Sequence, residues 1–161
     1  MIAWSNLDRK VAAVRASFAP LIRAKIARYE TAEIFLESSW DPLPDLPIRL
    51  YTADERIVAV SWSKFDDLWL ANDESVPFLF EGSTVRWVEN SIKALEPIVG
   101  ASILSAALGR GEMTLGGEEV ETWTRLLVEM DSGWFEVFNA LDENGYAFHA
   151  RRPKGDFVSC A

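Results

Sequence analysis

Side chains that commonly carry out catalysis are scarce in this sequence. It contains one histidine, His149, and one cysteine, Cys160, which is the penultimate residue. HExxH zinc proteases and two-histidine iron sites each need at least two imidazoles, so both classes are excluded. A lone cysteine forms neither an internal disulfide nor a thiolate zinc site. His149 has no evident partner for general-base catalysis, and the nearby Arg151 and Arg152 disfavour its charged form if they lie close.

Three short segments partly match nucleotide-binding or acylation motifs. Gly109-Arg110-Gly111 and Gly116-Gly117 lack the Lys-Ser/Thr of a P-loop and the glycine spacing of a Rossmann fingerprint. We interpret these glycines as tight turns around a short strand, Glu112–Leu115. Ser61-Trp62-Ser63-Lys64 matches the S-x-x-K motif of penicillin-binding enzymes, but the sequence contains no K-T-G motif. We therefore expect no cofactor.

Carboxylates are the remaining reactive groups. Asp54-Glu55, Asp66-Asp67 and Glu118-Glu119-Val120-Glu121 contain oxygen ligands suited to a hard cation. Adjacent residues on a strand point to opposite faces, so such pairs converge on an ion only within a turn. Asp142-Glu143-Asn144-Gly145 lacks the ligand spacing of an EF-hand loop. The sequence thus favours a solvated acidic surface over a metal site.

Tryptophan is unusually frequent, with seven copies in the chain: Trp4, Trp40, Trp62, Trp69, Trp87, Trp123 and Trp134. Most are expected in or beside the core, but aromatic residues are also enriched at the centres of recognition surfaces. Trp62, Trp69 and Trp123 stand beside charged or hydroxyl residues on predicted strands. Together with neighbouring acidic residues they define the candidate partner-binding set: Trp62, Asp66, Asp67, Trp69, Glu118, Glu119, Glu121 and Trp123.

The net charge of −9 is unevenly distributed along the chain. Residues 31–148 carry a net charge of −15, whereas residues 1–30 and 149–161 carry +4 and +2. An acidic body repels phosphate backbones, which argues against duplex nucleic acid as the ligand, and it attracts basic proteins. In the alternative interpretation, the excess charge serves solubility and the basic ends lie across the acidic body.

Length and composition are those of an ordinary globular domain. The chain has 161 residues, 49% of them apolar and 25% charged, so we expect one domain over residues 1–161. The longest uncharged stretch, Pro97–Gly109, is shorter than the ~18–20 residues that span a bilayer. The N-terminal residues contain no apolar run of signal-peptide length, which favours a cytoplasmic location.

Apolar spacing predicts an amphipathic helix near the N-terminus. Residues three and four positions apart lie on one helix face, and the residues with this spacing are Leu7, Val11, Val14 and Phe18. Pro20 lacks a backbone N–H and crowds the preceding turn, so the helix should stop or kink near Ala19. The apolar stripe continues beyond the proline at Ile22, Ile26 and Tyr29.

Strand-like runs dominate the rest of the chain. Ile48–Thr52 and Arg56–Ser63 predict a hairpin around Ala53-Asp54-Glu55. Three prolines within Trp40–Pro47 predict a stiff loop, and Asn144-Gly145 predicts a tight hairpin turn. Further strands are predicted at Glu33–Ser38, Asp67–Ala71, Val76–Phe80, Thr122–Met130, Trp134–Asn139 and Tyr146–His149.

Three segments fit either helix or strand. Thr122–Met130 favours a strand, with a helix as the alternative because Val120, Trp123, Leu127 and Met130 also fit a helical face. Residues 84–95 favour a helix from Trp87 onward, with a strand at Thr84–Val88 as the alternative, and residues 98–108 favour a strand. The expected fold class is α+β, with one domain in which the N-terminal amphipathic helix packs on a mainly antiparallel sheet of about five to seven strands.

No motif identifies a family. Few side chains suit catalysis, and the net charge of the chain is strongly negative. Both features favour a non-catalytic protein-binding module, such as an inhibitor or immunity protein acting on a basic partner. One alternative is a small enzyme or ligand-binding protein with a carboxylate-lined pocket. Another is a structural subunit of a homo-oligomer, with the N-terminal helix as a contact. The oligomeric state stays open at this stage.

Overall fold

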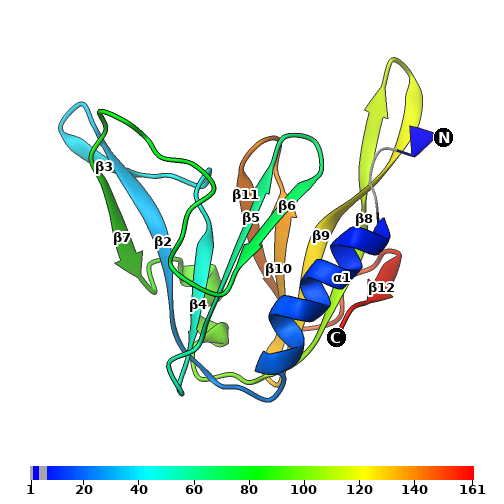
Figure 1. The fold of residues 1–161 in the computed structure, drawn as a ribbon, viewed down its shortest axis with the longest axis horizontal. Helices are drawn as coiled ribbons and strands as arrows, with labels where there is room; N and C mark the ends of the chain where they lie inside the picture. The colour runs from blue at the N-terminus through cyan, green and yellow to red at the C-terminus, as the bar shows by residue number, and fades with distance from the viewer. Residues whose placement is uncertain (1, 4–6) are drawn as a thin grey trace.

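One helix and twelve strands make up the regular structure in a computed structural model that describes residues 2–3 and 7–161 (Figure 1). The elements in chain order are β1 (Ile2–Ala3), α1 (Leu7–Phe18), a 3₁₀ turn (Ala19–Leu21), β2 (Ile26–Leu36), β3 (Ser39–Pro42), β4 (Ile48–Thr52), β5 (Ile57–Ser63), β6 (Asp67–Ala71), β7 (Val85–Glu89), a second 3₁₀ segment (Lys93–Ile98), β8 (Ile103–Leu115), β9 (Glu118–Met130), β10 (Gly133–Asn139), β11 (Asn144–His149) and β12 (Phe157–Ser159). Trp4 lies outside the described residues.

The strands form two six-stranded sheets. One has the order β11-β10-β9-β8-β12, with β1 added to β9, and the other has the order β3-β2-β4-β5-β6, with β7 added to β2. Among the described strands, every pairing is antiparallel except that of β1 with β9. The α+β class and the mainly antiparallel pairing are confirmed, but the expected five to seven strands were too few.

The predicted helix is confirmed, and it packs against β8 and β6. Val14 and Phe18 are fully buried, as their spacing predicts. The helix ends at Phe18, and Pro20 lies in the 3₁₀ turn that follows, which agrees with the expected stop. In the described part of the chain, no helix has the length and apolar character needed to cross a bilayer.

The main core contains side chains from α1 and from both sheets. It includes Val14 from the helix, Leu50 and Trp62 from one sheet, and Leu126 and Phe135 from the other. A smaller apolar cluster lies beside β2 and contains Ala32, Ile34, Leu43 and Leu46. The larger cluster therefore holds the helix and the two sheets together, because its side chains are removed from water jointly.

Asn144 connects the two sheets through a buried hydrogen-bond network, which we call the inter-sheet bracket. Its Oδ1 accepts from the Trp62 N–H at 2.6 Å, and its Nδ2 donates to the Leu46 carbonyl at 3.1 Å and to Ser61 Oγ at 3.0 Å. Its own N–H donates to the Pro44 carbonyl at 2.9 Å. The predicted Asn-Gly turn is therefore wrong, because Asn144 and Gly145 begin β11 and the tight backbone lies at Leu141 and Asp142.

The structure differs from the sequence predictions at several other segments. Residues 26–29, which extend the helical stripe, belong to β2, and the segment after Trp87 forms the end of β7 and a 3₁₀ segment rather than a helix. Val76–Phe80 is not a strand, and β3 occupies part of the proline-rich stretch at the sheet edge. At residues 26–29, pairing of β2 with the distant strands β4 and β7 outweighed the helical spacing.

Candidate functional site

The β8–β9 hairpin extends beyond its sheet as a two-stranded arm, residues 110–123. β12 pairs with β8 only as far as Gly109, and β10 pairs with β9 only as far as Arg125. Beyond these positions the two strands pair with each other, and β9 also pairs with β1. Figure 1 shows the arm projecting from the rest of the molecule.

Glycines shape the arm at its tip and at its base. Gly116 and Gly117 both have positive φ, 60° and 81°, as in a type I′ hairpin turn, so the predicted turn at this pair is confirmed. The turn predicted at Gly109-Arg110-Gly111 is wrong, because β8 runs through it without interruption. A Cβ at Gly111 would overlap Thr124 Oγ1, so glycine permits a close cross-strand approach there.

Four of the predicted partner-binding residues lie on the arm. Glu118 and Glu119 are exposed, whereas Glu121 and Trp123 are half-buried. Trp123 Nε1 donates to Glu121 Oε1 at 3.1 Å, and Arg110 donates to Glu119 Oε1 at 2.8 Å. The fold thus gathers much of the predicted acidic set onto one projecting hairpin.

Trp62 and Asp66 do not reach the surface. Trp62 is fully buried, and its Nε1 donates to the Val137 carbonyl at 2.9 Å. Asp66 is 7% exposed and lies 3.5 Å from Lys10 Nζ, which donates to the Trp123 carbonyl at 3.0 Å. Burial lowers the pKa of Lys10, against the opposing pull of Asp66. Through Lys10, these contacts attach α1 to the base of the arm. Because Trp62 and Asp66 are buried, they do not belong to the candidate surface.

The remaining two predicted residues lie on β6. Asp67 is exposed at the start of the strand, next to the β5–β6 turn. Trp69 is half-buried and stands opposite Ser61 of β5. Asp67 therefore belongs to the same end of the molecule as the β5–β6 turn, whereas Trp69 lies further along the strand.

The tips of two other hairpins meet the arm. Residues of the β5–β6 turn, the arm and the β10–β11 turn jointly line a cavity of about 100 Å³. Asn139 Nδ2 donates to the carbonyls of Lys64 and Phe65 at 2.8 and 3.0 Å, which fixes the two turns to each other. We call residues 64, 65, 67, 110–123 and 139–143 the hairpin-tip surface.

Each of the two turns on this surface displays one large apolar side chain, in addition to Leu115 of the arm, which is 40% exposed. Phe65 is 47% exposed and Leu141 is 83% exposed. Leu141 also has φ 63°, a left-handed conformation that costs a non-glycine residue roughly 1–2 kcal/mol. Sequence reasoning missed both residues, although a single leucine amid the turn-forming residues of segment 139–145 was a usable signal.

The hairpin-tip surface is strongly acidic. It contains seven carboxylates and two cationic side chains, a net charge of −5 out of −9 for the whole chain. The carboxylates are Asp67, Glu112, Glu118, Glu119, Glu121, Asp142 and Glu143. Most of the excess charge is therefore concentrated at one end of the molecule, beside the exposed apolar side chains.

A second polar cluster lies across β9, β10 and β11. Arg125 Nε donates to Glu136 Oε2 at 2.6 Å, and His149 Nε2 lies 2.9 Å from Glu136 Oε1. Burial alone raises the pKa of Glu136, but the hydrogen bonds from Arg125 and His149 outweigh it and lower that pKa. The expectation that His149 lacks a partner is wrong, because the β10–β11 register brings it beside this carboxylate.

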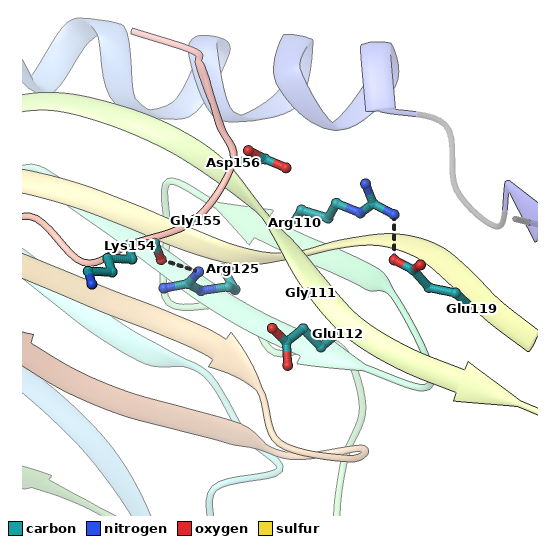
Figure 2. A pocket seen from close by; sticks show the side chains of 8 residues that line it. All are labelled: Arg110, Gly111, Glu112, Glu119, Arg125, Lys154, Gly155 and Asp156. Carbon is teal, nitrogen blue, oxygen red and sulfur yellow. Dashed lines mark hydrogen bonds and ion pairs between the residues drawn. The ribbon is translucent and has the colours of Figure 1, made fainter.

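A cleft of about 570 Å³ separates this region from the arm (Figure 2). It is lined by cations and carboxylates in equal number: Arg110, Arg125 and Lys154 with Glu112, Glu119 and Asp156. Among the described residues, no three His, Cys, Asp or Glu side chains are grouped to hold a metal ion, and no hydroxyl or thiol is hydrogen-bonded to His149. This arrangement lacks the paired nucleophile and base of acyl-transfer enzymes.

Comparisons with known proteins returned no match, neither to a family model, nor to a curated protein, nor to a solved structure.

Proposed function

We propose that this protein is a non-catalytic binding module that recognises a basic protein through the hairpin-tip surface. A concrete form of this role is an inhibitor or immunity protein that neutralises a basic enzyme. The observation that carries the proposal is the exposure of Leu141, 83%, in a left-handed backbone conformation beside Phe65. Strained, exposed apolar residues at a fixed turn are typical of recognition sites.

The energetics of such contacts favour a partner at this position. Burying an exposed leucine or phenylalanine contributes roughly 1.5–3 kcal/mol, so Leu141 and Phe65 together supply a binding centre. The turns that carry them are already connected through Asn139, so little ordering entropy is lost on binding. The surrounding carboxylates accelerate the encounter with a basic protein and disfavour an acidic one.

Site-specific photo-crosslinking in the native cells tests the proposal. A photoreactive amino acid replaces Leu141 or Leu115 on the surface, and Leu104 or Leu36 in the controls, which are 42% and 48% exposed elsewhere. We expect the two surface positions to capture the same basic protein, with adducts that decrease as salt is raised. Mass spectrometry of the adducts identifies this protein, and its sequence then gives its isoelectric point.

Three outcomes contradict the proposal. The first is the absence of any adduct at positions 141 and 115. The second is equal capture at the two control positions, which indicates contact without specificity. The third is a captured partner with an acidic isoelectric point, because the seven carboxylates would then repel it.

A further inference from the structure

The two edges of the arm differ in how they are paired. On one side, β1 runs alongside Val120 and Glu121 of β9. On the other side, β12 pairs with β8 only over residues 107–109. Within residues 2–3 and 7–161, no strand continues along residues 111–115 of β8. The arm therefore has one paired edge and one open edge.

Backbone geometry identifies the groups that face the open edge. The N–H of Ala106 donates to the Ala161 carbonyl at 3.0 Å and that of Arg110 to the Asp156 carbonyl at 2.9 Å, both on the β12 side of β8. In a strand, the N–H and C=O of alternate residues point to the same side. Glu112 and Thr114 continue this alternation, so their N–H and C=O groups face the open edge.

The C-terminal segment leaves β8 at the position where the open edge begins. Traced back from β12, the chain turns away at Gly155, whose φ is 141°. The Lys154 carbonyl then accepts from Arg125 Nη1 at 3.1 Å, which holds the segment over β9 (Figure 2). This φ favours glycine, and a Cβ at Gly155 would also come within 2.6 Å of Arg125 Nη1. The resulting cleft lies between Lys154–Asp156 and Arg110–Glu112.

The charge of the arm indicates what kind of protein segment could pair with the open edge. The arm contains four glutamates and one arginine, and that arginine is already paired with Glu119 at 2.8 Å. Arg125 is likewise paired with Glu136 at 2.6 Å. Glu112 stands exposed on the open strand itself. Pairing two copies of this edge would bring two acidic arms together, and their like-charge repulsion disfavours pairing with a second copy of this chain.

We propose that residues 111–115 of β8 bind an extended, basic segment of the partner protein as an additional β-strand. Glu112 and Thr114 supply the main-chain hydrogen bonds, and Glu112 attracts the basic side chains of the added strand. The inference rests on the proposed function and specifies how the partner docks. The cleft beside Arg110–Glu112 leaves room for the first residues of the added strand.

Fluorescence anisotropy with a labelled nine-residue peptide of alternating lysine and valine tests the inference. We expect saturable binding to the full chain, weakened at least tenfold by N-methylation of alternate peptide amides, since this blocks strand pairing but keeps the charge. Thr114→Pro should weaken binding at least tenfold as well. Its N–H faces the open edge, so a proline there is compatible with the β8–β9 pairing.

The controls separate folding from docking. Thr114→Pro should keep the melting temperature of the parent, and Thr114→Val, which retains the N–H, should keep its affinity for the peptide. The inference is overturned if the peptide does not bind, if the N-methylated peptide binds equally well, or if the free protein forms dimers that Thr114→Pro dissociates. Crosslinks at position 141 to a basic protein would then still support the proposed function.

Discussion

The inter-sheet bracket and the β8–β9 arm use backbone polar groups in opposite ways. At the bracket, the Asn144 side chain satisfies the Trp62 N–H and the Leu46 carbonyl inside the protein, and Asn144 itself is 3% exposed. On the arm, Glu112 and Thr114 present their backbone groups along an edge that no described strand covers. The first region fixes how the sheets sit together, and the second is available to another molecule.

This difference shows where stability and recognition reside in the chain. Unpaired buried polar groups are costly, so the bracket tolerates little change. Exposed edge groups are hydrated and cost little, but they pair readily with another strand. Substitutions should therefore separate into two classes: those at the bracket that reduce the free energy of unfolding, and those at the hairpin-tip surface that reduce binding.

Asn144→Ala should give the largest loss of stability. It leaves the Trp62 N–H, the Leu46 carbonyl and Ser61 Oγ without their partner, at a combined cost of about 3 kcal/mol. Urea denaturation measures the free energy of unfolding. Asn139→Ala is the matched control: it removes three exposed hydrogen bonds at the surface, so it should cost less than about 1 kcal/mol and should instead weaken partner binding. Equal losses for the two variants would contradict the comparison.

Glu136→Gln should cost about 2 kcal/mol near neutral pH, because the hydrogen bonds to Glu136 are charge-assisted. The pKa of Glu136 is lowered in the folded state, so its contribution is complete above its ordinary pKa of 4.5 and is lost as the pH falls through the folded pKa. Urea denaturation at pH 7 and pH 3 should show a larger difference from the parent at pH 7 than at pH 3. A difference that does not change with pH would contradict this role.

Gly111→Ala should destabilise the protein by about 1–2 kcal/mol, because the added methyl group overlaps Thr124 Oγ1 in a closely packed pair of strands. Thr124→Ala in the same chain removes the overlap and should recover part of the loss. Thermal unfolding of the single and double variants measures this coupling. Additive losses would show that the close approach at Gly111 is unimportant.

Of these variants, Leu141→Asn should change the free energy of unfolding least, and it should raise it where the others lower it. Asparagine tolerates the left-handed backbone at φ 63°, so this substitution should stabilise the protein by about 1 kcal/mol or less. It should also reduce capture of the basic partner, because the exposed leucine is lost. Leu104→Asn, at an exposed position away from the surface, should not affect capture. If Leu141→Asn left capture unchanged, the hairpin-tip surface would not be the binding site.

Local patterns predicted the elements whose partners lie nearby in the sequence. The spacing of Leu7, Val11, Val14 and Phe18 located α1, and the hairpin of β4 and β5 was found because its turn is short. β6 begins and ends at the predicted residues, Asp67 and Ala71. In these segments the periodicity and the final packing agree, so no distant contact had to override the local preference.

Elements set by distant partners could not be found in this way. Ile26 and Tyr29 fit a helical stripe, yet β2 pairs with β4 and β7, which lie further along the chain. The candidate surface was predicted in part: the acidic residues of the arm and Asp67 lie on it, whereas Trp62 is interior. Phe65 and Leu141 were missed because apolar residues in turns give no periodic signal.

Amide hydrogen exchange of the free protein tests the contrast between the two regions most directly. We expect the amides of Trp62 and Asn144 to exchange only through global unfolding, and those of Glu112 and Thr114 to exchange almost as fast as in an unfolded chain. Protection of Glu112 and Thr114 comparable to that of Trp62 would mean that the β8 edge is already covered, and would contradict the account.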